Sequence, residues 1–433
     1  MEDVDTLIIG GGVAGIACLA SLPPSHSSLL LEAEPDIGGL LRAYRFGEYV
    51  FDTVPHVLFF RDKALLAATK QLLGVPMHEF RRTNVIWQNG NIIAYPYQFN
   101  ACHLPVDIRN DCLEGMRAVS LADRNRGRTF KQWLLGQFGT GFYSHFFKPY
   151  NEKLYGTDLS ALEAGPLRWT IPRDNSQAVL SGAERPHPVS NELLYYPAGK
   201  RAIAAIVDSL AEPRRTQIRT NQRVVAIDSS RREAMTATGD RFRYCKVIST
   251  QPLPQLVRGI VDAPSSIRRL ADELRAVSIH VIRIGTRHNG PGLRNIWTYF
   301  PDPELPFYRM TRLEHISPDL CAPGAASILL ESSSVDPPSQ EAVVRFLRSA
   351  AVITSNEIDH FSVLTIPFAY VLFLRGFRKP LREIREFLEK AGVITAGRYG
   401  AWMYADIEMA LKSGISAARR VLEPGERLSS LVS

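Results

Sequence analysis

Apolar and polar residues alternate along the N-terminal part of the chain in the order expected of a parallel βαβ unit. An apolar run at residues 5–9 leads into a glycine-rich loop, and an apolar stretch that suits a helix follows at residues 13–20. A second apolar run, at residues 28–31, ends on the acidic residue Glu32. Continuous apolar runs of this length are typical of buried strands in parallel sheets.

The later pattern predicts that this unit is one part of a discontinuous domain. Residues 222–228 and 246–250 have the character of strands and should join the N-terminal sheet. A final apolar stretch at residues 392–404 leads into a helix predicted at 406–421 and should close the same domain.

Two further regions have different patterns. From about residue 108 to 162, apolar and aromatic residues recur at helical spacing, and these aromatic side chains should lie in a core. Between about 277 and 370, apolar runs such as 278–284 and 326–330 are interrupted by prolines, which predicts a mostly antiparallel sheet.

The glycine-rich loop provides the first chemical interpretation. Gly10 should make the tight turn after the strand, Gly12 should let the backbone approach a pyrophosphate, and Gly15 should allow close packing of helix on sheet. Glu32 ends the second strand, where a carboxylate can accept hydrogen bonds from a ribose diol. The combination predicts a dinucleotide cradle; the alternative is a glycine turn in an ordinary parallel α/β unit.

A second pair of glycines, Gly38 and Gly39, distinguishes between dinucleotides. Its distance from Glu32 resembles the extension found in flavoproteins of the glutathione-reductase and amine-oxidase group. This favours FAD over NAD, whereas a merely flexible turn would leave the spacing unexplained.

These patterns together predict an α/β fold with a Rossmann-type FAD-binding domain of the glutathione-reductase kind, a helical insertion and a mostly antiparallel substrate-side sheet. The expected division is 1–75, 200–262 and 392–425 for the FAD domain, 76–190 for a mainly helical insertion, 263–391 for the sheet domain, and 426–433 for a tail.

Composition and charge restrict the classes of ligand. The 433 residues are 45% hydrophobic and 22% charged, as in a globular protein of two or three domains. The net charge of +7 suits a small anionic ligand, while the basic runs lack the interleaved aromatics of nucleic-acid sites. The longest apolar segment, 366–374, is too short for a membrane span, and the first strand leaves no room for a signal peptide. Five cysteines without paired spacing complete the expectation of a cytoplasmic protein without a metal site.

Several segments taken together resemble the flavin-dependent UDP-galactopyranose mutases, within the wider superfamily of protoporphyrinogen and amine oxidases. The first and last of these segments are shared with the oxidases, and the middle ones are similar to the mutases. The segments are 51–56, 95–100, 147–155, 297–302, 306–309 and 397–402.

The resemblance implies a set of cofactor and substrate residues. Implied FAD contacts are Gly10, Gly12, Ala14, Gly15, Glu32, Gly38, Gly39, Leu40, Val224, Gly397, Tyr404 and Ile407. Implied contacts to a UDP-linked substrate are Tyr95, Tyr97, Gln98, Asn151, Tyr155, Arg173, Asn191, Arg309, Tyr370, Arg398 and Tyr404. Aromatic rings and amides suit a nucleobase, and guanidinium groups suit phosphate oxygens. His56, Arg309 and Arg398 are the implied catalytic residues.

The implied activity is the interconversion of pyranose and furanose forms of a nucleotide-linked sugar. In this family, N5 of reduced FAD attacks the anomeric carbon and UDP is the leaving group, so that no net oxidation occurs. NADPH or NADH is the implied reductant. The sugar, the reductant and the oligomeric state are left open by the sequence.

Some residues depart from the mutase pattern. Val54 and Pro55 stand where two glycines are usual, Tyr155 replaces a tryptophan, and residues 196–203 lack the usual glycine-rich character. These departures keep two alternatives open: an FAD-dependent oxidase or desaturase of the protoporphyrinogen or amine oxidase type, and an inactive FAD-binding scaffold.

Individual residues also have structural alternatives. Arg398 could brace a turn, and Arg309 could pair with Glu314. Tyr97 and Tyr155 could be core aromatics, and His56 could be a structural histidine.

Overall fold

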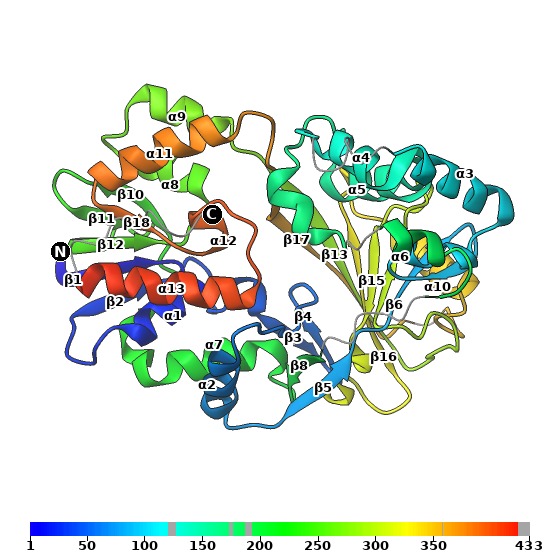
Figure 1. Cartoon of the computed structure of the whole chain (residues 1–433). Coiled ribbons are helices and arrows are strands. Elements are labelled where there is room, and N and C mark those ends of the chain that lie inside the picture. Colours follow the sequence, from blue (N-terminus) through cyan, green and yellow to red (C-terminus); the bar gives the residue numbers. More distant parts are fainter. Residues whose placement is uncertain (120–126, 173–175, 187–192, 357, 423–433) are drawn as a thin grey trace.

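A computed structural model describes residues 1–119, 127–172, 176–186, 193–356 and 358–422. Two large β-sheets dominate it, and each has its own set of helices (Figure 1). The N-terminal sheet lies between helices α1 and α13 on one face and α8, α9 and α11 toward the other, while α3, α4 and α5 lie beside the second sheet.

The first sheet joins strands from three separate parts of the chain. Its strand order is β10-β11-β12-β1-β2-β9, and β18 also pairs with β12. Strand β1 is parallel to β2 and to β12, and β12 is parallel to β18. On its other side, β12 continues into an antiparallel meander with β11 and β10. The bounds are β1 Glu2–Ile9, β2 Ser28–Leu31, β9 Ile218–Arg219, β10 Val224–Asp228, β11 Glu233–Thr236, β12 Arg241–Ser249 and β18 Val393–Thr395.

Two glycines let helices pack closely against this sheet and against each other. A Cβ atom at Gly15 would lie 1.9 Å from the carbonyl oxygen of Gly10, and one at Gly414 would lie 2.1 Å from the carbonyl oxygen of Ala14. Helix α1 therefore contacts both β1 and α13 through bare backbone. The helices of this half are α1 Val13–Ser21, α2 Lys63–Leu73, α7 Ala205–Ala211, α8 Leu253–Gly259, α9 Ser265–Asp272, α11 Arg378–Lys390, α12 Gly397–Gly400 and α13 Ile407–Leu422.

The second sheet is antiparallel except where β14 runs parallel to β6. Its order is β17-β13-β16-β15-β14-β6-β7. The strands are β6 Asn84–Gln88, β7 Asn91–Ala94, β13 Ala276–Thr286, β14 Trp297–Tyr299, β15 Arg309–Arg312, β16 Ala326–Ser332 and β17 His360–Val371. The apolar segment 366–374, the strongest membrane-span candidate in the sequence, begins within β17.

The strands β6 and β7 lie inside the region that the sequence assigned to a mainly helical insertion. They form a hairpin around Asn89 and Gly90, whose φ angles are +49° and +77°. Positive φ at both positions is the signature of a tight hairpin turn, and Asn-Gly is the sequence that prefers it. The helical expectation was therefore wrong for these residues. The Asn-Gly pair between two short apolar runs was the sequence feature that indicated the hairpin.

The helical insertion proper follows this hairpin. The capping box at Thr129 and Gln132 starts α4, and the aromatic residues predicted to be core, including Phe130 and Trp133, are fully buried. Its helices are α3 Val106–Arg117, α4 Phe130–Phe142, the π-helical turn Tyr143–Phe147, α5 Lys148–Tyr155 and α6 Ser176–Ser181.

Smaller elements connect these parts. Two small sheets pair β3 Ala43–Phe46 with β4 Tyr49–Asp52 and β5 Met77–Arg81 with β8 Leu193–Pro197. Helix α10 spans Gln340–Ser349, and the 3-10 turns are Gly39–Leu41, Tyr97–Phe99, Ala101–His103, Gly165–Thr170, Ala202–Ala204, Glu212–Gln217, Leu313–His315 and Pro318–Leu320.

Replacement of Gly414 by alanine tests the contact between α1 and α13. Alanine normally stabilises a helix interior relative to glycine, but here the added methyl group meets the Ala14 carbonyl, so we expect a loss of roughly 1 to 3 kcal/mol. Urea unfolding measures the change. Arg419→Ala, on the exposed side of the same helix, is the control; a more stable Gly414→Ala protein would contradict the packing.

Candidate functional site

The glycine loop forms the base of the first cavity. Gly10 has a φ of +103°, a value that favours glycine, and its amide donates to the carbonyl of Leu31 at 2.8 Å. A Cβ atom at Gly12 would meet nothing within 4 Å, although Gly12 has an ordinary φ of −71°. The backbone thus leaves open space where helix α1 begins, and the first amides of a helix attract an anion.

Glu32 is already positioned beside this loop. Its Oε2 atom accepts from the amide of Gly11 at 2.6 Å, and its Oε1 atom accepts from the amide of Glu34 at 2.9 Å. The side chain is only 8% exposed and lines the cavity. The two amides fix the position of this carboxylate, which can also accept hydrogen bonds from a diol.

The second glycine pair folds back onto the first. The amide of Gly38 donates to the carbonyl of Gly11 at 2.8 Å, and a Cβ atom at Gly39 would lie 3.2 Å from the Cα atom of Gly12. Both glycines have positive φ, +113° and +56°. Their spacing after Glu32 therefore has a structural reason, because this turn completes the wall of the cradle.

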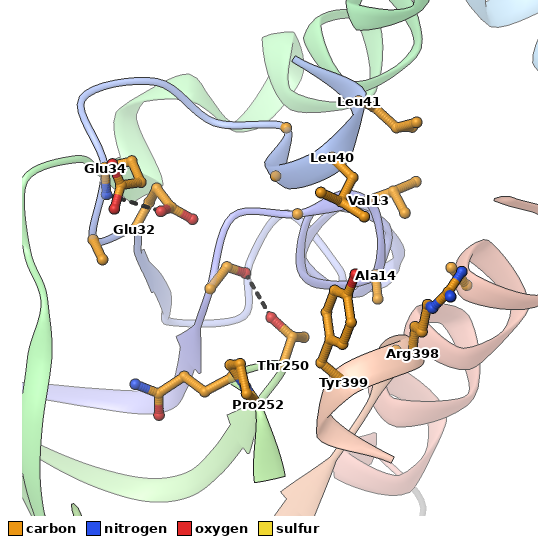
Figure 2. Close-up of a pocket in the computed structure, with 18 of the residues that line it drawn as sticks. Val13, Ala14, Glu32, Glu34, Leu40, Leu41, Thr250, Pro252, Arg398 and Tyr399 are labelled. Atoms are coloured by element: carbon orange, nitrogen blue, oxygen red, sulfur yellow. Dashed lines mark hydrogen bonds between the residues drawn. The ribbon is translucent and has the colours of Figure 1, made fainter. Parts of the chain in front are cut away.

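The first cavity has a volume of about 360 Å³ and runs from Glu32 to Arg398, which lie at opposite ends of it (Figure 2). Its length, its open backbone at Gly12 and its carboxylate at one end fit a dinucleotide such as FAD. All the predicted FAD residues except Gly15 and Tyr404 line it. Gly15 acts from behind, through the packing of α1.

A second cavity, of about 320 Å³, lies on the second sheet. Its floor is a row of side chains that crosses the sheet from strand to strand. Tyr299 on β14 is opposite Arg309 on β15, and Arg309 is opposite Glu331 on β16. The other polar and aromatic lining residues include Arg82, Asn84, Trp297, Tyr370, Arg398 and Tyr404.

The two cavities share a wall. The residues that line both are Leu40, His56, Arg398, Ala405, Asp406 and Ile407. A ligand group at this wall is within reach of both cavities. The reactive part of a dinucleotide in the first cavity would therefore meet a substrate in the second cavity.

Asp406 fixes part of the shared wall. Its Oδ1 atom accepts from the amide of Met409 at 2.8 Å and so caps α13, while its Oδ2 atom lies 2.6 Å from a guanidinium nitrogen of Arg61. Arg61 also donates its backbone amide to Glu408 at 2.6 Å. The segment after His56 is thereby tied to the start of α13.

Arg398 is the most prominent cation of the site. Its guanidinium carbon lies 4.4 Å from the ring centre of Tyr404 and 5.5 Å from that of Tyr370, and one nitrogen donates to the carbonyl of Ala369 at 3.1 Å. Its Nε atom is buried and has no hydrogen-bond partner among the described residues. No carboxylate in that part of the chain pairs with it.

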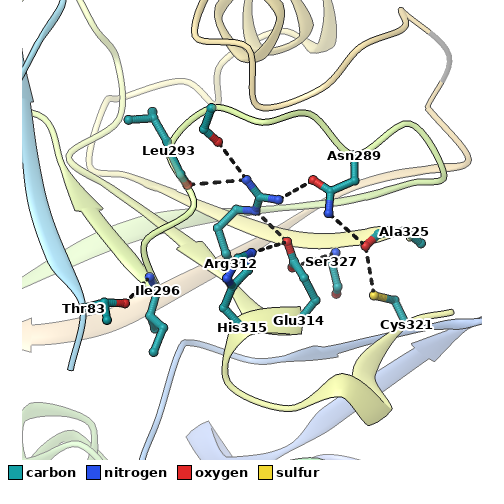
Figure 3. Close-up of polar contacts among 11 residues, drawn as sticks. Thr83, Asn289, Leu293, Ile296, Arg312, Glu314, His315, Cys321, Ala325 and Ser327 are labelled. Carbon is teal, nitrogen blue, oxygen red and sulfur yellow. Dashed lines mark hydrogen bonds and ion pairs between the residues drawn. The ribbon is translucent and has the colours of Figure 1, made fainter. Parts of the chain in front are cut away.

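Arg309 has a buried partner, although not the one considered in the sequence. Its guanidinium forms a two-pronged ion pair with Glu331, one bond of which is 2.8 Å, and Glu331 is 1% exposed. Glu314 pairs instead with Arg312 at 2.6 Å, within a separate network (Figure 3). A pairing of Arg309 with Glu314 was therefore wrong, because register places Glu331 opposite Arg309.

His56 is neutral at the shared wall. Burial, with the positive charges of Arg398 and Arg309, lowers the pKa of its imidazole to about 4. Between pH 5 and 8 the imidazole therefore carries no charge but can donate one hydrogen bond and accept another.

Asp52, four residues before His56, is a fully buried carboxyl group. It accepts from the hydroxyl of Tyr196 at 2.9 Å, and its other oxygen has no partner among the described residues. Burial raises its pKa to about 7, although the Tyr196 hydroxyl and the nearby amides of Ile203 and His56 act to lower it.

The structure brings some predicted substrate residues together and leaves others apart. Arg309, Tyr370, Arg398 and Tyr404 all line the second cavity. Tyr404, also predicted to touch FAD, does not line the first. Arg173 and Asn191 lie outside the described residues.

The residues predicted to bind uracil and ribose line neither cavity. Tyr97 is fully buried against Phe146, with ring centres 4.7 Å apart. Asn151 donates to the carbonyl of Phe147 at 2.7 Å, and the Tyr155 ring lies 6.4 Å from that of Tyr370. Trp297 and Tyr299 lie in the mutase-like segment 297–302 but were not predicted as site residues, and Arg82, Asn84 and Glu331 were not identified from the sequence. Their alternation along short strands was the available signal.

The described residues contain neither a helix suited to a membrane nor a cluster of metal-binding side chains. No helix in these ranges is long and apolar enough to cross a bilayer. Nor does this part of the chain contain a group of three or more histidine, cysteine, aspartate or glutamate side chains arranged for a metal ion.

Comparison with known proteins places this geometry in context. A family model, flavin containing amine oxidoreductase, matches residues 14–422. A crystal structure of reduced UDP-galactopyranose mutase is similar with a TM-score of 0.89 and 22% identity, over 97% of this chain and 94% of that one. Cyclohexylamine oxidase from Brevibacterium oxydans is similar with a TM-score of 0.67 and 14% identity, over 98% and 100% of the two chains.

A redesigned putrescine oxidase is also similar, with a TM-score of 0.63 and 11% identity over 97% and 99% of the chains. At these identities the similarities show the fold. They confirm the predicted α/β architecture and the resemblance to the mutase within the amine oxidase-like FAD superfamily.

Two glycine substitutions should separate cofactor binding from folding. Gly12→Val places its side chain in the open space of the cradle, so we expect a folded protein that retains no flavin. Gly15→Ala meets the Gly10 carbonyl and should lower the melting temperature of the protein itself. Absorbance at 450 nm and circular dichroism measure the two effects. A Gly12→Val protein loaded with FAD would contradict the cradle.

Asp52→Asn should change the dependence of stability on pH. The pKa of Asp52 is about 7 in the fold and about 3.9 in an unfolded chain, so the native state holds the proton more tightly and wild-type stability should fall as pH rises from 4 to 7. We expect Asp52→Asn to gain stability relative to wild type between pH 5 and pH 8 in urea titrations. Asp107→Asn, at an exposed position, is the control; equal responses would contradict the shift.

Proposed function

The chain belongs to the flavin containing amine oxidoreductase family, and from that premise we propose that it is an FAD-dependent mutase that interconverts the pyranose and furanose forms of a nucleotide-linked sugar. The substrate is a UDP-linked sugar, and NADPH or NADH reduces the flavin.

The observation that carries this proposal is the charge of the second cavity. Arg82 and Arg398 have no carboxylate partner among the described residues. The two carboxylates of the cavity lining are both paired, Glu331 with Arg309 and Asp406 with Arg61. An amine substrate is a cation and would be repelled by this excess of positive charge. A diphosphate would be attracted, because guanidinium groups match phosphate oxygens.

The surroundings of Arg398 suit a leaving diphosphate. The Ala369 carbonyl fixes one side of its guanidinium, and Tyr370 and Tyr404 pack against its faces. Their hydroxyl groups can donate to the same phosphate oxygens. Because Arg398 also lines the shared wall, a diphosphate bound there stays beside the reacting carbon and can return, which is an effective-concentration gain.

The residues of the shared wall fit a bound FAD, which would supply the covalent chemistry of the reaction when reduced. Neutral His56 contributes no charge at this wall and can accept or donate one hydrogen bond. Glu331 orients Arg309 toward the cavity by its two-pronged contact.

An oxidase of the protoporphyrinogen or amine oxidase type is the second candidate. Val54 and Pro55 give the second cavity an apolar rim beside His56, and Ile366 adds to it. An apolar substrate with acidic groups would fit this rim and the arginines together.

Two assays distinguish these functions. The mutase proposal predicts that dithionite-reduced protein binds UDP and converts a UDP-sugar to its furanose form. Chromatography of the products measures the conversion. Aerobic turnover that produces peroxide without any need for nucleotide would favour the oxidase. Failure to bind UDP and to convert any UDP-sugar would remove the mutase proposal.

Arg398→Ala tests the diphosphate site. Loss of a charge that faces a desolvated diphosphate should weaken UDP binding by roughly 2 to 5 kcal/mol. Titration of the reduced protein with UDP, read by flavin fluorescence, measures it. Arg385→Ala is matched, since Arg385 also holds a backbone carbonyl, that of Ala401 at 2.7 Å, but lines neither cavity. Unchanged affinity in Arg398→Ala would remove this residue from the site.

A further inference from the structure

The first cavity has one end that faces solvent. Glu34 and Arg223 line this end, and their side chains are 45% and 56% exposed. The opposite end, at Arg398, continues into the second cavity through the shared wall. A dinucleotide that reaches the first cavity directly from solvent therefore has to pass Glu34 and Arg223.

Two segments from distant parts of the chain meet at this end. Glu34 follows β2, whereas residues 220–223 lead from β9, which pairs with β2, to β10 at the opposite end of the strand order. This second segment runs beside the cavity, because Gln222 and Arg223 both line it. An ion pair joins the two segments: a guanidinium nitrogen of Arg223 donates to Oε1 of Glu34 at 2.8 Å.

The main chain on both sides of the ion pair is held by other contacts. The amide of Asn221 donates to the carbonyl of Glu34 at 3.1 Å, and the carbonyl of Arg223 accepts from the amide of Ala237 at 2.8 Å. The two charged side chains can therefore separate by rotation about their own bonds, while these backbone hydrogen bonds stay in place.

An exposed ion pair of this kind opens readily. Water weakens the attraction, and each long side chain loses rotational freedom when it is paired, so the closed form should outweigh the open form by only roughly 1.4- to 5-fold. Glu32, in contrast, is 8% exposed and is held by two backbone amides inside the cavity. This end of the cavity thus combines a fixed inner carboxylate with an outer ion pair that can open.

We propose that Arg223 and Glu34 form a gate for FAD: their ion pair closes the solvent end of the first cavity, and the cofactor enters and leaves when the pair opens. The two side chains bind each other and not the cofactor, so they close the empty and the loaded cavity alike. Entry and exit are then slowed by the same factor, and the Kd for FAD is unchanged. This inference goes beyond the proposed function, since it requires FAD in the first cavity but no particular substrate.

Dilution of the FAD-loaded protein measures both quantities. The change in flavin fluorescence follows release of the cofactor, so its rate gives the dissociation rate constant and its final level gives Kd. Neither Arg223→Gln nor Glu34→Gln can form the ion pair. We expect the dissociation rate constant to rise roughly 1.5- to 5-fold in each variant, with an unchanged Kd.

Arg219→Gln is the matched control. Arg219 pairs with Glu2 through two hydrogen bonds of 2.7 and 2.8 Å, and both side chains are 44% exposed. Neither residue lines the first or the second cavity. This variant should release FAD at the wild-type rate.

Exchange of the two charges tests the ion pair itself. A protein that carries both Arg223→Glu and Glu34→Arg can form the pair in the opposite sense, so its dissociation rate constant should return toward the wild-type value. In 1 M NaCl, where charges are screened beyond about 3 Å, wild type and either single variant should release FAD at similar rates. One folded single variant is therefore enough for the test.

Three results would overturn the inference. The first is an unchanged dissociation rate constant in both single variants. The second is a Kd that rises together with the dissociation rate constant, because the side chains would then contact the cofactor itself. The third is fast release from the charge-exchanged protein. None of these measurements depends on turnover of a sugar, so failure of the mutase proposal is distinguished by its own assays.

Discussion

The direct backbone contact of helix α1 with its neighbours is the constraint on which the rest of the structure depends. Gly15 lets the helix rest on the loop at Gly10, and Gly414 lets α13 rest on the carbonyl of Ala14. A side chain at Gly15 would push α1 away from the glycine loop, and one at Gly414 would push α13 away from α1. Because the contacts are close, the first amides of α1 face the cavity, and the segment before α13 brings Arg398 to its far end. A motif at the start of the chain and a helix at its end thus form one cradle.

The second sheet provides the other half of the site by a different principle. Neighbouring strands place one side chain each in a row across the sheet. Polar side chains that are far apart in the sequence therefore lie next to one another in the cavity. The pairing of Arg309 with Glu331 shows the consequence for charge. One arginine is neutralised and held in place, whereas Arg398 and Arg82 keep their positive charge for a ligand. The net character of the cavity follows from strand register as much as from composition.

The sequence predicted those parts of the fold that depend on local patterns. The glycine loop, Glu32 and the second glycine pair each act through backbone geometry within a few residues, and they lie where expected. The hairpin at Asn89 and Gly90 was equally local but was absorbed into a helical region that surrounds it.

The contacts that depend on register or on packing between distant segments could not be read in this way. Whether Arg309 meets Glu314 or Glu331 is decided by how β15 and β16 align. Whether Tyr97 faces a cavity or the core is decided by the position of Phe146, on another element. Asn84 has no recognisable motif in the sequence, and its place in the second cavity follows from the pairing of β6 with β14.

The ion pair between Arg61 and Asp406 connects the loop that follows His56 with the start of α13. Asp406 caps α13, lines both cavities and holds the segment that follows His56. The loop and the helix are therefore joined at the wall between the two cavities. Loss of the Asp406 carboxylate would remove a contact from both cavities at once, so the shape of each depends on the same side chain.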